Sequence, residues 1–224
     1  MFHAVPRTRP ILSLALGVAL SAPAAGCGRK APAEGSAAAP AAATAATTNT
    51  APSVKAGPPP AQVAAVLKAL QQQLGAELKG AMARGGPVEA VSACNLRAPA
   101  IAATVSRPGL RVGRTSHRLR NPNNAAPAWA ADAVAALPGK RLDKIPAQQT
   151  FDLGEGKHGY LEVILTGELC LSCHGPSDGL DAGLKSKLAE LYPSDAATGF
   201  AKGDVRGFFW AEYDDTVATA DTEH

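Results

Sequence analysis

Residues 160–174 read YLEVILTGELCLSCH, a stretch in which a strand-forming pattern is followed directly by two cysteines and a histidine. Residues 160–166 are mostly aromatic and aliphatic types that favour extended backbone. The end of the stretch carries two cysteines separated by two residues, Cys170 and Cys173, and His174 follows at once. The sequence therefore predicts a strand that leads into a group of two thiols and an imidazole.

The segments on either side of this stretch predict an α+β fold. Apolar residues recur at three- and four-residue steps from Val63 to Leu78, which predicts a helix over about 61–83. Gly85-Gly86 breaks that helix, and Pro87 suits the first position of a second one, which we expect to reach about 105. Helices are also predicted at 125–138 and 182–191, and extended segments at 110–119, 150–153, 160–166 and 205–212. Helices come first and strands dominate later, which is typical of α+β domains.

The first 26 residues have the pattern of an export signal. Arg7 and Arg9 precede an apolar run at 11–20, and no acidic residue occurs before Glu34. The run is too short to span a bilayer, and small residues follow it, as in a secretory signal peptide. The sequence AAGC, which ends at Cys27, resembles the cleavage site of bacterial lipoproteins, although Ala24 stands where leucine is usual. We predict that Cys27 is lipidated; cleavage near Ala25 with an incidental cysteine is the alternative.

Residues 28–60 are dominated by Ala, Pro, Thr, Gly and Ser, and Val54 is their only aliphatic residue larger than alanine. Such a segment cannot bury enough apolar surface to offset its ordering entropy. We therefore predict a flexible tether over 27–60 and a folded domain over 61–224. The expected location is the periplasm, with a lipid anchor in the outer or inner membrane. Gly28, rather than aspartate, follows the lipidated cysteine, and resemblance to other lipoproteins then favours the outer membrane.

The formal net charge of +3 is too small to indicate a nucleic-acid partner. No basic run interleaved with aromatic residues occurs either. We expect no nucleic-acid binding.

The C-x-x-C-H spacing at 170–174 is the attachment pattern of c-type haem. In such sites each thiol forms a thioether with one vinyl group, and the adjoining histidine, here His174, is the proximal iron ligand. A structural zinc site needs four ligands, usually with a second Cys/His pair at similar spacing. No such pair occurs here: besides the motif, the predicted domain has one cysteine, Cys94, and the isolated histidines His117, His158 and His224. A disulfide between the two motif cysteines would leave the histidine unexplained. The export signal favours haem, because haem c is attached outside the cytoplasm. The sequence thus predicts one covalent haem c on Cys170 and Cys173.

Cys94 is the cysteine left over, on the same predicted helix stripe as Val91, Ala98 and Ile101. It is either a small buried residue or the second axial ligand of the iron, and these residues alone leave both readings open. Met82 is the only methionine after the signal, and it precedes the haem motif. An ordinary small cytochrome c, with a methionine ligand downstream of the motif, is therefore excluded.

Three segments resemble a family of bacterial periplasmic PAS-like domains that carry one c-type haem, either as stand-alone proteins or as input modules of sensor kinases. The first joins Arg114-Thr115-Ser116 to RNPNNAAPAW at 120–129, and the second is CLSCHG at 170–175. The third runs from YPSD at 192–195 through ATG at 197–199 to GDVRG at 203–207. Their order and spacing are specific, and the resemblance covers the chain from Ala61 to its end.

The resemblance implies a PAS-like antiparallel sheet with long amino-terminal helices and one covalently attached haem. In that family a helical cysteine before an Ala-Pro-Ala-Ile-like stretch is an axial ligand, and Cys94, ahead of APAI at 98–101, matches it. We therefore expect Cys94 to be the distal ligand. His117 stands where the family usually has an apolar residue. We expect it at the surface, and a competing ligand is the alternative.

Arg114 and Arg206 lie in the resembling segments, where either could pair with a haem propionate. Solvated or structural arginines are the equally good alternative. We expect Tyr192 and Asp204 to fix turns.

A thiolate opposite an imidazole favours ferric iron and a low reduction potential. With six ligands the iron has no open position for a substrate, so we expect no enzyme. His117 is the only candidate for the polar group of a peroxidase, and a poor one. The remaining functions are redox or gas sensing and signalling, in which Cys94 is displaced, or electron transfer with fixed ligands. The sequence reaches His224 without a kinase module, so we expect a free-standing lipoprotein with a separate redox or signalling protein partner.

Overall fold

The computed structural model describes residues 53–55 and 57–219 of the chain. The predicted signal peptide, the lipidated Cys27 and most of the predicted tether lie outside these residues. No helix among the described residues combines the length and the apolar character needed to cross a membrane.

The long amino-terminal element α1 (Ala61–Val105) consists of two helices that meet at Gly85 and Gly86. Gly86 has φ 65° and ψ −156°, a conformation that residues with a Cβ rarely adopt. Pro87 then begins the second helix, where its missing N–H is not needed. The predicted break is confirmed.

The sheet has five antiparallel strands in the order β1-β3-β4-β5-β2. Its strands are β1 (Ser53–Lys55), β2 (Leu110–Thr115), β3 (Gln148–Gly154), β4 (Lys157–Leu165) and β5 (Val205–Asp214). The turn between β3 and β4 lies at 154–156, where the glycines at 154 and 156 and the residue between them all have positive φ. The α+β prediction is confirmed, with a long helical element and an antiparallel sheet.

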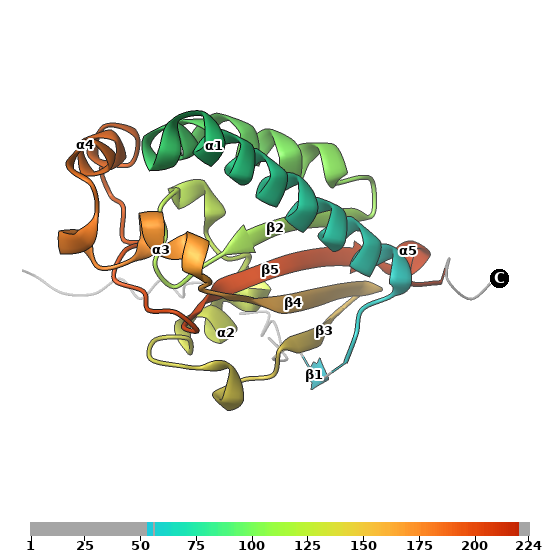
Figure 1. Ribbon diagram of the computed structural model, residues 1–224. Coiled ribbons are helices and arrows are strands. Elements are labelled where there is room, and N and C mark those ends of the chain that lie inside the picture. The colour runs from blue at the N-terminus through green and yellow to red at the C-terminus, as the bar shows by residue number, and fades with distance from the viewer. Residues whose placement is uncertain (1–52, 56, 220–224) are drawn as a thin grey trace, which may run out of the picture. The chain divides into compact units, whose positions relative to one another are not determined.

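Successive side chains of β4 point to opposite faces of the sheet, and both faces are buried. Tyr160 is fully buried in a cluster with Val63 and Leu67 of α1. Its neighbour Leu161 is fully buried in a second cluster on the other face, with Val134 and Phe208. Figure 1 shows α1 over one face of the sheet and α2 (Ala131–Ala135) on the other. Because neighbouring residues of β4 are apolar on opposite faces, helices can pack on both sides of the sheet.

Two connections between strands carry the remaining helices. The first, between β2 and β3, holds α2 and the 3-10 turns η1 (Pro122–Asn124), η2 (Ala128–Ala130) and η3 (Leu142–Lys144). The second, between β4 and β5, holds α3 (Glu168–His174), η4 (Ser177–Gly179) and α4 (Ala182–Leu191). The short helix α5 (Asp215–Thr219) follows β5. The cysteine motif therefore lies on a helix directly after β4.

Two predicted segments differ from the structure by more than a shift of their ends; among the smaller shifts, β2 ends at Thr115 and not at 119. The helix expected over 125–138 is reduced to η2 and α2, because Pro127 disfavours helical backbone at the residue before it. Ser53–Lys55, which was predicted to belong to the tether, pairs with β3 as a short edge strand. Strand pairing uses backbone groups, so it does not require the apolar side chains that this segment lacks.

Candidate functional site

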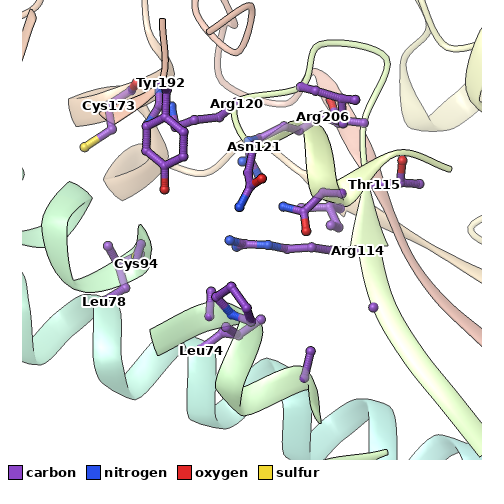
Figure 2. A pocket seen from close by; sticks show the side chains of 18 of the residues that line it. Leu74, Leu78, Cys94, Arg114, Thr115, Arg120, Asn121, Cys173, Tyr192 and Arg206 are labelled. Carbon is purple, nitrogen blue, oxygen red and sulfur yellow. Dashed lines mark hydrogen bonds between the residues drawn. The ribbon is translucent and has the colours of Figure 1, made fainter. Parts of the chain in front are cut away.

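A cavity opens between α1, the segment after β2, and α3 (Figure 2). Its volume is about 130 Å³, far more than the roughly 10–15 Å³ that one water molecule requires. One wall is apolar and belongs to α1, and the opposite wall carries arginine and other polar side chains. The residues used below are Leu74, Leu78, Cys94, Arg114, Arg120, Cys173, Tyr192 and Arg206.

Two cysteines that are distant in sequence line this cavity. Cys94 comes from the second half of α1 and Cys173 from α3, and Cys173 is 8% exposed. Cys170, half-buried, lies one helical turn before Cys173, where its Sγ accepts a hydrogen bond from the Gly167 N–H at 3.3 Å. All three cysteines of the described residues are free thiols. The fold thus brings the predicted distal residue to the cavity that the attachment motif also lines.

Burial raises the pKa of the Cys94 thiol, and the nearby Arg114 guanidinium opposes this shift. Burial raises the pKa of Cys173 as well, with Arg120 acting in the opposite direction. A thiol in this place keeps its proton at neutral pH unless a metal or another cation stabilises the thiolate.

His174, the last residue of α3, is held through one ring nitrogen. Its Nδ1–H donates to the Ala197 carbonyl at 2.6 Å, which leaves Nε2 as the nitrogen with a free lone pair. Burial, followed by the charges of Arg206 and Arg120, lowers the pKa of His174 to about 2. The imidazole is therefore neutral, the form that binds a metal. It does not itself line the cavity, and its ring lies 6.4 Å from that of Phe200, edge to face.

The structure places Arg114 and Arg206 on the cavity wall without a carboxylate partner. Neither makes an ion pair with any residue in the described part of the chain, and the Nε–H of Arg206 is buried without a hydrogen-bond acceptor. Burial lowers the pKa of both guanidinium groups, and that of Arg206 falls to about 10. Unpaired buried charge is unfavourable, so this wall is suited to an anionic group of a ligand.

A β-bulge directs Arg206 into the cavity. Leu165 pairs with Val205 and Ile164 pairs with Gly207, which leaves Arg206 as the extra residue of β5. Bulges of this kind re-aim a side chain. Gly207 is needed beside it, because an added Cβ would lie 2.0 Å from the Thr115 carbonyl oxygen.

The sequence did not single out two residues of the site. Arg120 donates from Nη2 to the Cys173 carbonyl at 2.6 Å and from Nε to Asp195 at 3.1 Å. Tyr192 was predicted only to fix a turn, but it is 8% exposed and extends into the cavity between Cys173 and Cys94 (Figure 2). Burial and then Cys94 raise its pKa. Both residues belong to segments that resemble the haem-binding family, Arg120 in RNPNNAAPAW and Tyr192 in YPSD. This resemblance could have identified them as candidate site residues.

His117 differs from the surface residue that was expected. Its side chain is half-buried, its Nδ1 is buried without a partner, and its ring lies 5.6 Å from that of Phe200. Burial lowers its pKa. Phe200 packs over the His117 ring, a contact that the sequence alone cannot show. His117 is not among the residues that line the cavity. Asp204 fixes a turn as predicted, by accepting from the Ala201 N–H at 2.7 Å.

Comparison with known proteins gives one family and one solved structure. A sequence model of the Tll0287-like family matches residues 36–212. A crystal structure described as that of the cyanobacterial heme-protein Tll0287 is 22% identical in sequence, covering 69% of this chain and 93% of that chain, with a TM-score of 0.49. No curated protein sequence matches the chain.

Proposed function

The chain belongs to the Tll0287-like family, and from this premise we propose that it is an exported protein that binds one haem covalently. The protein that gives this family its name is described as a cyanobacterial heme-protein. In the proposed arrangement Cys170 and Cys173 form the two thioethers, His174 is the proximal iron ligand and Cys94 is the distal one. The fold class that we propose is PAS-like, with β2 paired to the last strand β5 and α1 across the sheet.

One observation carries this proposal. Cys94 and Cys173 line the same cavity, and its opposite wall holds two half-buried arginines without carboxylate partners in the described residues. Haem brings an apolar ring, a metal that stabilises a thiolate, and two propionates. The apolar α1 wall with Leu74 and Leu78 suits the ring. Arg114 and Arg206 suit the propionates, each of which a guanidinium can bind in bidentate fashion.

When bound, haem would supply a one-electron redox centre, and the chain's residues would set its potential. A Cys94 thiolate and the neutral imidazole of His174 would hold the iron, and the anionic donor would favour its ferric state. Because the protein would then supply both ligands and leave no open position for a substrate, we propose no enzymatic activity.

The role that we propose is redox or gas sensing, in which reduction or a small gas displaces Cys94. Cys94 lies on the second half of α1, which follows the Gly85–Gly86 break, so its release would act on a helix that packs against both β2 and α4. An electron carrier would instead keep Cys94 bound in both redox states. Spectra of the ferric and ferrous protein, with and without carbon monoxide, separate the two roles. A thiolate-ligated ferrous spectrum that carbon monoxide leaves unchanged would contradict sensing.

Covalent attachment is tested by producing the full chain in a periplasm with haem-attachment machinery. The denatured protein is then extracted with acidified organic solvent. We expect the colour to stay with the protein, and to move into the solvent when both Cys170 and Cys173 are replaced by alanine. Colour that leaves the wild-type protein would end the proposal.

We also propose that the protein is a periplasmic lipoprotein anchored through Cys27, with a redox or signalling protein as its partner. The export pattern of residues 1–26 and the composition of the predicted tether support this location. A bacterial lipoprotein carries several acyl chains, which is enough for stable anchoring.

A further inference from the structure

A charged pair next to the cavity connects the end of α3, which includes His174, to the segment at 195–200 that bonds the His174 side chain. Arg120 and Asp195 form an ion pair with 3.1 Å between Nε and Oδ2, and their side chains are only 13% and 10% exposed. The same guanidinium donates from Nη2 to the carbonyl of Cys173 at 2.6 Å. A cation at the carboxyl end of a helix satisfies a carbonyl that has no partner within the helix. Arg120 thus bonds the attachment motif and the carboxylate at once.

Asp195 continues this chain of hydrogen bonds to the imidazole. Its Oδ1 accepts from the Ala197 N–H at 2.8 Å, and the Ala197 carbonyl accepts from His174 Nδ1 at 2.6 Å. The carboxylate therefore sets the orientation of the peptide segment whose carbonyl fixes the imidazole. Two backbone bonds hold the same segment against the motif, from Gly199 N–H to the Gly175 carbonyl at 2.8 Å and from Phe200 N–H to the His174 carbonyl at 2.9 Å.

We propose that Arg120 and Asp195 are positioning residues for His174, which set the direction and strength of its Nδ1–H hydrogen bond and thereby the donor strength of its Nε2. This rests on the proposed function, because Nε2 has a ligand to meet only if haem is bound. The bond to Nδ1 fixes the ring orientation of a ligating histidine and raises its basicity. The planar fork of Arg120 can meet the Cys173 carbonyl and Asp195 together, whereas the ammonium group of lysine is a single point charge.

The test uses Asp195→Asn in the full chain. The amide oxygen can still accept from the Ala197 N–H, but the ion pair with Arg120 is lost. Asp204→Asn is the matched control, because Asp204 also caps a backbone N–H, that of Ala201, and pairs with an arginine. Its partner Arg141 lies 3.8 Å away and is 63% exposed, and neither residue bonds the segment at 195–200 that holds the imidazole.

Two readouts are compared in the wild type and both variants. Without haem, nitrogen-15 NMR measures the exchange of the His174 Nδ1–H. We expect exchange to become about tenfold faster in Asp195→Asn, the factor for a hydrogen bond weakened by about 1.4 kcal/mol. With haem, loss of imidazole basicity should raise the reduction potential, by 59 mV for each tenfold loss of preference for ferric iron. The Asp204→Asn variant should leave both values as in the wild type. Unchanged values in Asp195→Asn, or equal changes in Asp204→Asn, would overturn the proposal.

Arg120→Lys provides a second route if Asp195→Asn does not fold. It keeps the positive charge but loses the fork, so we expect faster Nδ1–H exchange than in the wild type; wild-type exchange would exclude a positioning role for Arg120. A wild-type chain that acquires no haem would refute the proposed function, and the exchange measurement would still decide whether Arg120 and Asp195 hold the imidazole.

Discussion

Replacing Arg206 by methionine should stabilise the protein without haem and weaken it with haem. Arg206 lies at the β5 bulge and lines the cavity, and its Nε–H is buried without an acceptor. Burial and the neighbouring Arg114 lower its pKa to about 10, so at neutral pH the side chain is still charged but unfavourably placed. Methionine has a similar length and no polar group that needs a partner.

The expected size follows from the unsatisfied group. A buried donor without a partner costs about 1–3 kcal/mol, so the haem-free variant should gain about 2 kcal/mol in free energy of unfolding. For a domain of this size that corresponds to a rise in Tm of roughly 4–8 °C. With haem bound, the sign should reverse, because a propionate would then lose its guanidinium partner.

Thermal unfolding followed by circular dichroism, on protein made with and without haem-attachment machinery, measures both effects. Arg111→Met is the control: Arg111 is 67% exposed and 3.6 Å from Glu212, so its replacement should change stability by less than about 0.5 kcal/mol. A lower Tm for haem-free Arg206→Met would show that the guanidinium stabilises the fold by itself, and the reasoning from an unpaired buried charge would be refuted.

Three further outcomes are expected. Cys94→Ala should shift the ferric haem spectrum away from a thiolate form and raise the reduction potential, whereas His117→Ala should do neither; an unchanged Cys94→Ala spectrum contradicts ligation. Gly86→Ala should lower the free energy of unfolding by about 1–3 kcal/mol in urea titrations, because its φ is 65°. Gly75→Ala, in the helix interior with open space around it, should raise the free energy by about 1 kcal/mol, and equal signs would refute the backbone argument. Cys27→Ser should release the protein from membranes on fractionation, and a variant that stays bound would exclude a lipid anchor.

Much of the fold could be predicted from the backbone preferences of individual residues in the sequence. The break in α1 follows from Gly85 and Gly86 before Pro87, and the β3–β4 turn follows from the glycines at 154 and 156. Both depend on the conformational range of single residues, which neighbours in space alter little. The helix at 125–138 was less readable, because one proline within the segment outweighed the general helix preference of its alanines.

The chemistry of the site was partly local as well. The spacing of Cys170, Cys173 and His174 predicts haem attachment because the three residues lie within five consecutive positions, so no long-range folding is needed to bring them together. For Cys94, residue pattern alone left a buried thiol and an iron ligand equally open. The cavity that it shares with Cys173 is formed by packing of α1 against α3 and the segment after β2, which is a long-range property.

Tertiary structure alone decided which charges surround that cavity. Pairing of β2 with β5 brings Arg114 and Arg206 to the same cavity wall, and the bulge in β5 turns Arg206 inward. Arg120 belongs to the connection between β2 and β3, whereas its partners Asp195 and the Cys173 carbonyl both belong to the connection between β4 and β5. An arginine in a sequence carries the same charge whether it is solvated or buried. Only the packing around it determines whether that charge has a partner, and two of these guanidinium groups have none among the described residues.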